Sequence, residues 1–281
     1  MKKLILRHIK ITRIKLFIAR LLYRFTRIIY SNPIQKVERG GLKLELDLRE
    51  GIDLHVFWFG LFQKHVYENE LIQIPSDGVI LDIGGNIGMM SLVFAQKVPQ
   101  GKVHSFEPTD YAIQKFRTNM ALNPDLASRI ILNQSFVSYE SKDSVNIKVF
   151  SSWPVVGSED KHAIHQGVLK SGDNIPSIRL DDYCTNAQLE RVDFVKIDTD
   201  GYEWDVLRGS KEMLKKYKPQ VIFEIGIYVM QEKGISFSDY EDFFTDLGYR
   251  LYTVKNQSVS RTNFEDHIPR YGTIDLIALP A

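Results

Sequence analysis

The sequence predicts an α/β fold in which a mostly parallel sheet carries helices on both faces. From residue 79 onward, short apolar runs of strand length alternate with longer amphipathic stretches of helical period, which is the pattern of βαβ units. The first apolar run, residues 79–83, leads into a glycine-containing turn and then into a helix. That order of elements suits an anionic or nucleoside-containing ligand, because a helix start offers unpaired N–H groups.

The composition is that of an ordinary globular protein. The chain has 281 residues, of which 44% are hydrophobic and 25% charged, so a sizeable core is expected and global disorder is not. A net charge of +1 argues against a wholly basic nucleic-acid binder, and we expect no nucleic-acid partner. The single cysteine, Cys184, excludes an internal disulfide and fits a reducing, cytoplasmic compartment. We interpret it as a small apolar residue rather than a reactive thiol.

Residues 1–40 are interpreted as a basic N-terminal extension, in which no acid precedes Glu38. Basic residues interrupt every apolar run, so neither a signal peptide nor a membrane-spanning helix of ~20 apolar residues is predicted. Residues 12–30 instead have the period of a basic amphipathic helix, which suits the inner face of an anionic membrane. Packing on the domain, or on a second subunit of a homo-oligomer, is an equal alternative. The residues on its apolar side are Ile14, Phe17, Ile18, Leu21, Leu22, Phe25, Ile28 and Ile29, with Arg13, Arg20, Arg24 and Arg27 beside them.

Residues 41–281 are expected to form one domain. In residues 42–48, leucines alternate with charged residues, which predicts a strand with one buried face. An aromatic-rich stretch over 56–60 and a helix over 62–74 follow, and we expect them to cover one entrance of the core.

The order of the remaining elements follows from the alternation after residue 79. The predicted strands are 79–83, 102–106, 129–133, 145–150, 193–197, 221–225, 249–254 and 273–279, and the predicted helices are 88–98, 110–122, 203–217 and 238–247. Residues 151–175 lack a clear period and are interpreted as a long loop, a common place for binding residues. In that loop, Trp153 could stack on a sugar face, and His162 or His165 could act as a base or contact an acceptor; solvated histidines are the alternative.

A first group of residues points to S-adenosylmethionine. The turn Asp82-x-Gly84-x-Asn86-x-Gly88 has its acid at the strand end, unlike the dinucleotide fingerprint G-x-G-x-x-G. Glu107 ends the next strand, where a carboxylate can accept hydrogen bonds from ribose hydroxyls. Asp82 could orient a water or bind an ammonium, and adenine is expected near residues 134–136. We therefore assign the cofactor to Asp82, Gly84, Asn86, Gly88, Glu107, Pro108 and Ser135; a structural turn with a surface Glu is the alternative.

A second group of acids ends two later strands. Asp198 and Glu224 should meet in one crevice, because ligands of open α/β sheets bind beyond the carboxyl ends of the strands. They could serve as general bases for a hydroxyl nucleophile or share a Mg²⁺ ion. Lys196 alternates with Asp198 along the strand and is expected to pair with it, which makes it a third catalytic candidate. Glu203, in the first turn of the next helix, could contact substrate or compensate the helix charge.

These motifs resemble the FkbM family of methyltransferases. The resemblance covers roughly residues 42–279, and its most specific part is Lys196-Ile197-Asp198-Thr199-Asp200-Gly201-Tyr202-Glu203. It implies the class I methyltransferase fold, a Rossmann-like seven-stranded sheet whose last strand is antiparallel. It also implies S-adenosylmethionine as methyl donor and, usually, a hydroxyl acceptor on a sugar or natural product. The family commonly has Glu at position 200 and Ala at position 85, where this chain has Asp200 and Gly85.

We therefore predict an O-methyltransferase that acts on a hydroxyl of a sugar, glycan or glycolipid. Base methylation is disfavoured, because enzymes of that kind more often carry [DN]-P-P-[YFW] where this chain reads Asp198-Thr199-Asp200-Gly201. One alternative is a metal-dependent O-methyltransferase acting on a small natural product. Another is a catalytically degenerate, membrane-associated binding module, against which the intact Asp82, Glu107 and Asp198 count.

Overall fold

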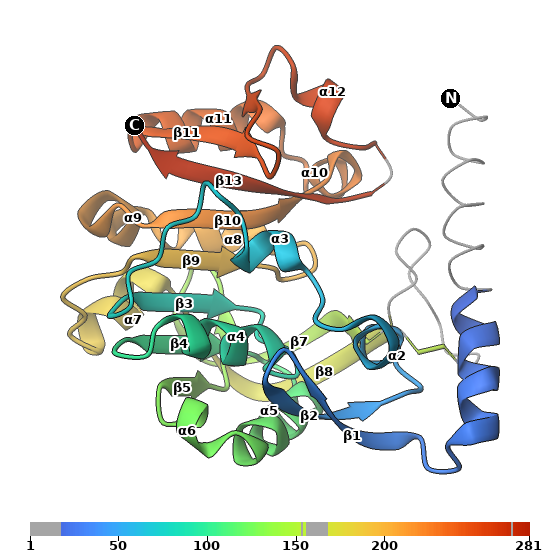
Figure 1. The fold of residues 1–281 in the computed structure, drawn as a ribbon. Coiled ribbons are helices and arrows are strands. Elements are labelled where there is room, and N and C mark those ends of the chain that lie inside the picture. Colours follow the sequence, from blue (N-terminus) through green and yellow to red (C-terminus); the bar gives the residue numbers. More distant parts are fainter. Residues whose placement is uncertain (1–17, 153, 156–167, 271) are drawn as a thin grey trace.

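A large, mostly parallel sheet organises the molecule (Figure 1). The computed structural model describes residues 18–152, 154–155, 168–270 and 272–281. The sheet has eight strands in the order β12-β11-β13-β10-β9-β3-β4-β5, and β13 runs antiparallel to both of its neighbours. The predicted fold class is thereby confirmed, with β12 as an additional edge strand. The strands are β3 (Val79–Ile83), β4 (Lys102–Phe106), β5 (Ile130–Asn133), β9 (Phe194–Ile197), β10 (Gln220–Ile225), β11 (Tyr249–Thr253), β12 (Ser258–Val259) and β13 (Ile274–Pro280).

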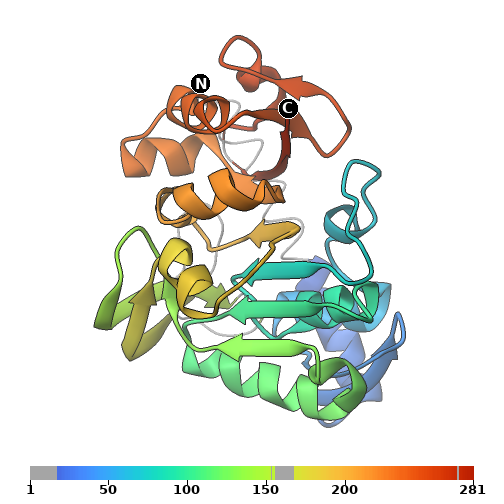
Figure 2. The same ribbon diagram turned by 90° about the vertical axis from the view of Figure 1, so that its left-hand side faces the viewer.

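Helices cover both faces of this sheet, as Figure 2 shows for the yellow and orange helices on one side and the blue and cyan segments on the other. Successive residues of a strand point to opposite faces, so Ile80 and Leu81 enter different cores. The core around Ile80 contains α4 (Met89–Lys97) and α5 (Asp110–Leu122). The core around Leu81 contains α7 (Leu180–Asn186), α8 (Glu203–Arg208), α9 (Lys211–Tyr217) and α11 (Phe237–Asp246). Shorter helices are α6 (Pro124–Ala127), α10 (Ile227–Lys233) and α12 (Phe264–His267).

The segment before β3 contains a hairpin and two helices. β1 (Ile34–Arg39) pairs antiparallel with β2 (Leu42–Asp47), so the boundary expected between residues 40 and 41 falls in the hairpin turn. The alternation predicted for β2 is confirmed, because its three leucines are fully buried. α2 (Gly51–Phe59) follows. The helix predicted over 62–74 is wrong beyond α3 (Lys64–Tyr67), because Asn69 accepts from the Leu71 N–H and donates to the Val254 carbonyl, which favours a turn.

Two further expectations are corrected. Both described ends of the loop predicted over 151–175 belong to strands, since β8 (Val168–Ile178) pairs with β7 (Lys142–Ser152) and with β6 (Phe136–Val137) in a separate three-stranded sheet. Register shifts in the β7–β8 pair obscure the alternation that would have revealed β8. Trp153, His162 and His165 lie outside the described residues.

The helix predicted over 203–217 is two helices, α8 and α9. The helix is interrupted at Gly209, where a Cβ would lie 2.1 Å from the Ser138 carbonyl oxygen. The Gly209 carbonyl accepts a hydrogen bond from the Asp181 N–H, which holds the break against α7.

Residues 18–29 form an N-terminal helix that rests against α2. Thr26 is fully buried there, and its hydroxyl accepts a hydrogen bond of 2.9 Å from the Trp58 indole. The predicted residues Ile14 and Phe17 lie outside the described part. Within the described ranges, no helix combines the length and apolar character needed to cross a membrane.

Candidate active site

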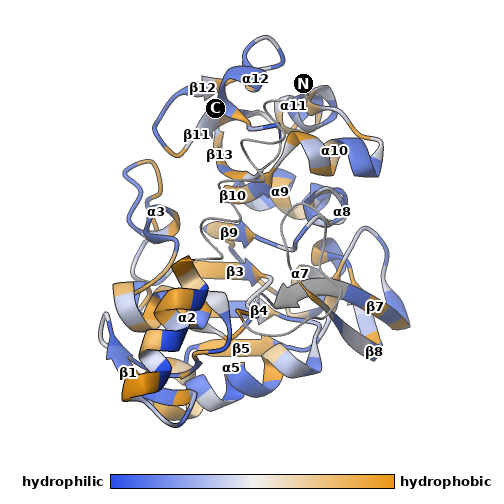
Figure 3. Cartoon of the chain, turned by 90° about the vertical axis from the view of Figure 1, so that its right-hand side faces the viewer, coloured by the Kyte–Doolittle hydropathy of each residue, from blue (hydrophilic) through white to orange (hydrophobic). Residues whose placement is uncertain are grey.

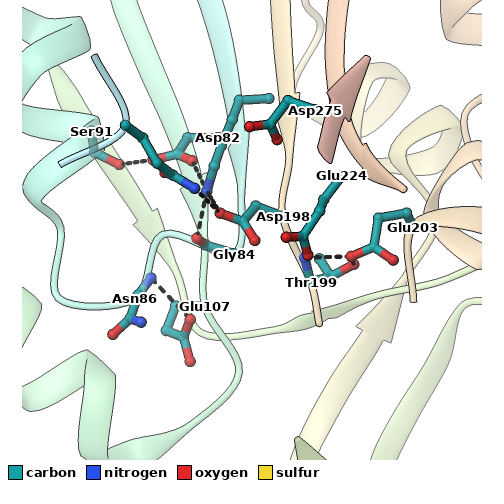
Figure 4. Close-up of polar contacts among 12 residues, drawn as sticks. Asp82, Gly84, Asn86, Ser91, Glu107, Asp198, Thr199, Glu203, Glu224 and Asp275 are labelled. Atoms are coloured by element: carbon teal, nitrogen blue, oxygen red, sulfur yellow. Dashed lines mark hydrogen bonds and ion pairs between the residues drawn. The ribbon is translucent and has the colours of Figure 1, made fainter. Parts of the chain in front are cut away.

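A cavity of about 510 Å³ opens at the carboxyl ends of β3, β4, β9 and β10. Its volume is in the range of small-molecule sites. On one side, the turn side, lie residues 84–87, Glu107 and Ser135; on the other, the carboxylate side, lie Asp198, Asp200 and Glu224. Figure 4 shows Asn86 and Glu107 apart from the group formed by Asp198 and Glu224. The two groups of residues predicted from the sequence therefore meet in one cavity.

The glycines of the turn are required by packing within the protein. Gly84 has φ +80, and a Cβ there would lie 1.8 Å from the Asp198 carbonyl oxygen. Gly88 also has positive φ, and a Cβ there would lie 2.2 Å from the Phe116 ring. Gly84 lines the cavity and Gly88 is not among its lining residues, and the cofactor contact of Gly88 stays a prediction. The turn is tight because two strands and a helix converge on it.

Asp82 lies behind the cavity wall and not in it. Its side chain is fully buried, and one oxygen accepts a hydrogen bond of 2.5 Å from the Ser91 hydroxyl. Its other oxygen lies 3.3 Å from the Lys196 ammonium. The predicted contact of Asp82 with a ligand ammonium stays a prediction, and in the structure the Lys196 ammonium lies beside this carboxylate.

Lys196 connects the two sides of the cavity. Its Nζ donates a hydrogen bond of 2.9 Å to the Gly84 carbonyl and lies 3.6 Å from Asp198 Oδ2. Burial disfavours its charged form, but the carboxylates of Asp82 and Asp198 outweigh burial and raise the pKa of Lys196. The predicted pairing with Asp198 is confirmed. Lys196 is consequently a permanent cation here, and not a proton acceptor.

Glu107 is held in place by hydrogen bonds from both strand end and turn. Its Oε2 accepts from the Asn86 N–H at 3.0 Å, and its Oε1 accepts from the N–H and hydroxyl of Thr109 at 2.9 and 2.7 Å. Burial raises the pKa of Glu107, and the hydrogen bonds from Thr109 and Asn86 oppose that rise. A carboxylate has about four acceptor positions, so Oε2 keeps capacity for one further donor from the cavity.

Ser135 lies on the turn side with an unused polar atom. Its Oγ is buried and has no hydrogen-bond partner within the described ranges. Buried hydroxyls are normally hydrogen-bonded, so this atom marks a place for a polar ligand group. Pro108, Ser135 and Phe136 all line the cavity, as the predicted position for adenine requires.

The carboxylate side concentrates negative charge. Asp198 Oδ2 accepts a hydrogen bond of 3.1 Å from Gln63, and Glu224 Oε1 accepts one of 2.5 Å from the Thr273 hydroxyl. Burial, and then the charge of Asp198, raise the pKa values of Asp200 and Glu224 well above their ordinary range. Carboxyl groups with raised pKa values are suited to proton transfer near neutral pH.

Glu203 belongs to the support of this site. Its carboxylate accepts from the Thr199 N–H at 2.8 Å and from the Gly201 N–H at 3.1 Å, which fixes the loop between β9 and α8. It is not among the cavity-lining residues. The substrate contact of Glu203 stays a prediction, and its position in the first turn of α8 is also the one that its alternative role, compensation of the helix charge, requires.

A Mg²⁺ ion shared by Asp198 and Glu224 finds no support in the structure. In the parts of the chain that the structure describes, no group of three or more His, Cys, Asp or Glu side chains is arranged to hold a metal. The ammonium of Lys196 already compensates charge beside Asp198. No step below depends on a metal.

Sequence reasoning missed several residues of the cavity. Gln63 and His55 come from the segment before β3, and only its expected position over the core entrance pointed to them. Asp200 lines the carboxylate side, although in the sequence it attracted notice merely as a shorter acid than the family's Glu. Ser91, which holds Asp82 and also lies 3.0 Å from the Ser105 hydroxyl, gave no signal.

The chain is similar in sequence to known methyltransferases. The model of the methyltransferase FkbM domain matches residues 82–251. The 2-O-methyltransferase NoeI of Sinorhizobium fredii is 31% identical over 167 residues, which are 55% of this chain and 68% of that protein. Methyltransferase sdnD of Sordaria araneosa is 27% identical over 186 residues, 57% of this chain and 70% of that protein. A crystal structure of the FkbM methyltransferase of Methylobacillus flagellatus aligns with TM-score 0.48 and 16% identity over 74% of this chain and 45% of that one.

Proposed function

This chain belongs to the FkbM family of methyltransferases, and on that premise we propose that it transfers a methyl group from S-adenosylmethionine to a hydroxyl of a sugar, glycan or glycolipid. The observation that supports the proposal most is the position of Lys196. Its ammonium contacts both the Gly84 carbonyl of the turn and the Asp198 carboxylate on the other side of the cavity. The printed activity of its relative NoeI, 2-O-methylation, supports an oxygen acceptor.

The turn side fits S-adenosylmethionine. The remaining capacity of Glu107 Oε2 suits a ribose hydroxyl, and the orphaned Ser135 Oγ suits a polar edge of adenine. Asn86 keeps Glu107 oriented, because its N–H is the donor that holds Oε2. When bound, S-adenosylmethionine supplies an electrophilic methyl group on a positively charged sulfur.

On the carboxylate side, Asp198 takes the proton of the acceptor hydroxyl. The Gln63 hydrogen bond and the nearby Lys196 ammonium compensate a negative charge on Asp198, so it is available as the base. Glu224, whose pKa is raised by burial and then by Asp198, holds a proton more readily and can donate a hydrogen bond to the same oxygen. As the hydroxyl oxygen bonds to the methyl carbon, its proton would pass to Asp198 and the methyl–sulfur bond of the donor would break. Fixed positioning supplies much of the rate.

The test joins a binding titration to a product assay. We expect calorimetry to show S-adenosylmethionine binding to the full-length protein. A panel of mono- and oligosaccharides and glycolipids, incubated with enzyme and donor, should give by mass spectrometry a product heavier by one methylene unit. Absence of donor binding would contradict the proposed methyltransferase activity. Methylation of amines but not of hydroxyls would contradict the proposed hydroxyl acceptor.

A further inference from the structure

The N-terminal helix has three distinct faces. The face against the domain contains Ala19, Leu22, Tyr23 and Thr26. A second face carries Arg20, Arg24 and Arg27. The third, which we call the outer apolar face, consists of Ile18, Leu21, Phe25, Ile28 and Ile29, with exposed fractions of 57, 47, 53, 82 and 54%. Of the described residues predicted to share one apolar side, Leu22 packs on the domain, and the half-exposed Phe25 ring lies 6.2 Å from the Trp58 ring. The others point outward.

The helix is fixed in this orientation by its contacts with α2. Trp58 donates its indole N–H to Thr26, and Tyr30 packs edge-on against Phe57 at a ring distance of 5.3 Å. Turning the outer apolar face inward would break both contacts. Burial of large apolar side chains is favourable, so five of them exposed on one helix face indicate a surface that is covered in use.

The charge of the segment favours one occupant. No acid occurs before Glu38, whereas Arg20, Arg24 and Arg27 follow the helical period beside the outer apolar face. Figure 3 shows both hydrophilic and hydrophobic stretches in the elements around α2. Packing of this helix on the same helix of a second copy would bring arginine rows together without an acid on either helix to pair with them. An anionic bilayer satisfies both features, because apolar side chains enter the acyl boundary while arginine stems reach back to the headgroups.

We propose that the outer apolar face docks the protein on the surface of a membrane containing anionic lipids, with the N-terminal helix lying in the interface. The exposed Phe59 at the end of α2 would add to that contact. α2 links the docked face to the cavity, since Ile52 and His55 line the cavity while Trp58 holds the helix. If the proposed function also holds, a lipid-linked acceptor would reach the cavity from the membrane side; this consequence rests on that function.

Vesicle flotation of the full-length protein tests the proposal. The probes are phosphatidylcholine vesicles containing about one third phosphatidylserine, and vesicles of phosphatidylcholine only. We expect the wild type to float with the anionic vesicles and to be released at high salt. The double variant Leu21→Glu, Ile28→Glu should lose binding by about tenfold or more. Ile131→Glu on β5, with an exposed fraction of 41%, is the matched control and should float like the wild type.

Three outcomes would overturn the proposal. The first is that the wild type floats with neither kind of vesicle, and the second is that the double variant floats as well as the wild type. The third is that light scattering finds a dimer for the wild type and a monomer for the double variant, which would assign the face to a second copy. S-adenosylmethionine binding, measured on each variant in solution, shows that the domain is folded. That measurement also separates failure of the membrane proposal from failure of the proposed function.

Discussion

Glu107 and Glu224 are both largely buried acids at the carboxyl ends of parallel strands, yet their surroundings differ. On the turn side, Glu107 accepts three hydrogen bonds, two of them from backbone N–H groups. On the carboxylate side, Glu224 accepts one from Thr273 and faces Asp198 and Glu203, which raise its pKa further after burial has done so. Hydrogen bonds thus fix the Glu107 carboxylate on the turn side, whereas Glu224 on the carboxylate side is poorly compensated, which suits proton transfer.

The strongest test of this difference removes the residue that joins the two sides. Lys196→Met should destabilise the protein by about 3–5 kcal/mol, because it leaves Asp82 as a buried charge without its cation. Chemical denaturation measures the loss, and the exposed Lys97→Met on α4 is the control. Equal stability of the two variants would show that Lys196 does not compensate Asp82.

A weaker effect is expected on the turn side alone. Glu107→Gln replaces one carboxylate oxygen by an NH₂ group, which cannot accept the hydrogen bond from the Asn86 or Thr109 N–H. S-adenosylmethionine should therefore bind about 10–100-fold more weakly. Calorimetric titration measures this affinity, with the exposed Glu70→Gln as control. An unchanged Kd in a folded variant would remove Glu107 from the cofactor site.

Glu224→Gln should act on stability in the opposite direction. The raised folded-state pKa means that protonation of Glu224 stabilises the fold below its ordinary pKa and that this contribution is lost as pH rises through the folded value. The variant, which cannot ionise, should therefore melt higher than the wild type at pH 8, by about 2–4 °C per kcal/mol of repulsion relieved. The difference should shrink towards pH 5. A lower Tm at pH 8 would show that Glu224 is well compensated.

The smallest effect is expected away from the cavity. Cys184 is buried in the core around Leu81, and burial raises the pKa of its thiol to about 12. A maleimide should leave the folded protein unmodified and label it completely after denaturation. Rapid labelling of the folded protein would mean that this core opens locally.

The sequence allowed prediction of the parts that local pattern determines. Apolar runs identified β3, β4, β9 and β10, and acids at their ends identified both sides of the cavity, since parallel strands end at a common edge. Gln63 reaches Asp198 across 135 residues, a contact that no local pattern predicts. Asp82 and Glu203 were assigned to ligands because their residue types fit, but neighbouring donors inside the protein use their oxygens. β8 was missed because its register with β7 is irregular.

The proposed function gives Asp198 the proton of the acceptor and the turn side the methyl donor. It is tested most directly by Asp198→Asn, with the single-turnover rate of methyl transfer and the Kd for S-adenosylmethionine measured on the same preparation. We predict a rate about 10²–10⁴-fold lower, because the acceptor loses its general base, with a Kd within about threefold of the wild type. A wild-type rate in the variant, or a loss of donor binding that accounts for the whole decrease, would contradict the account.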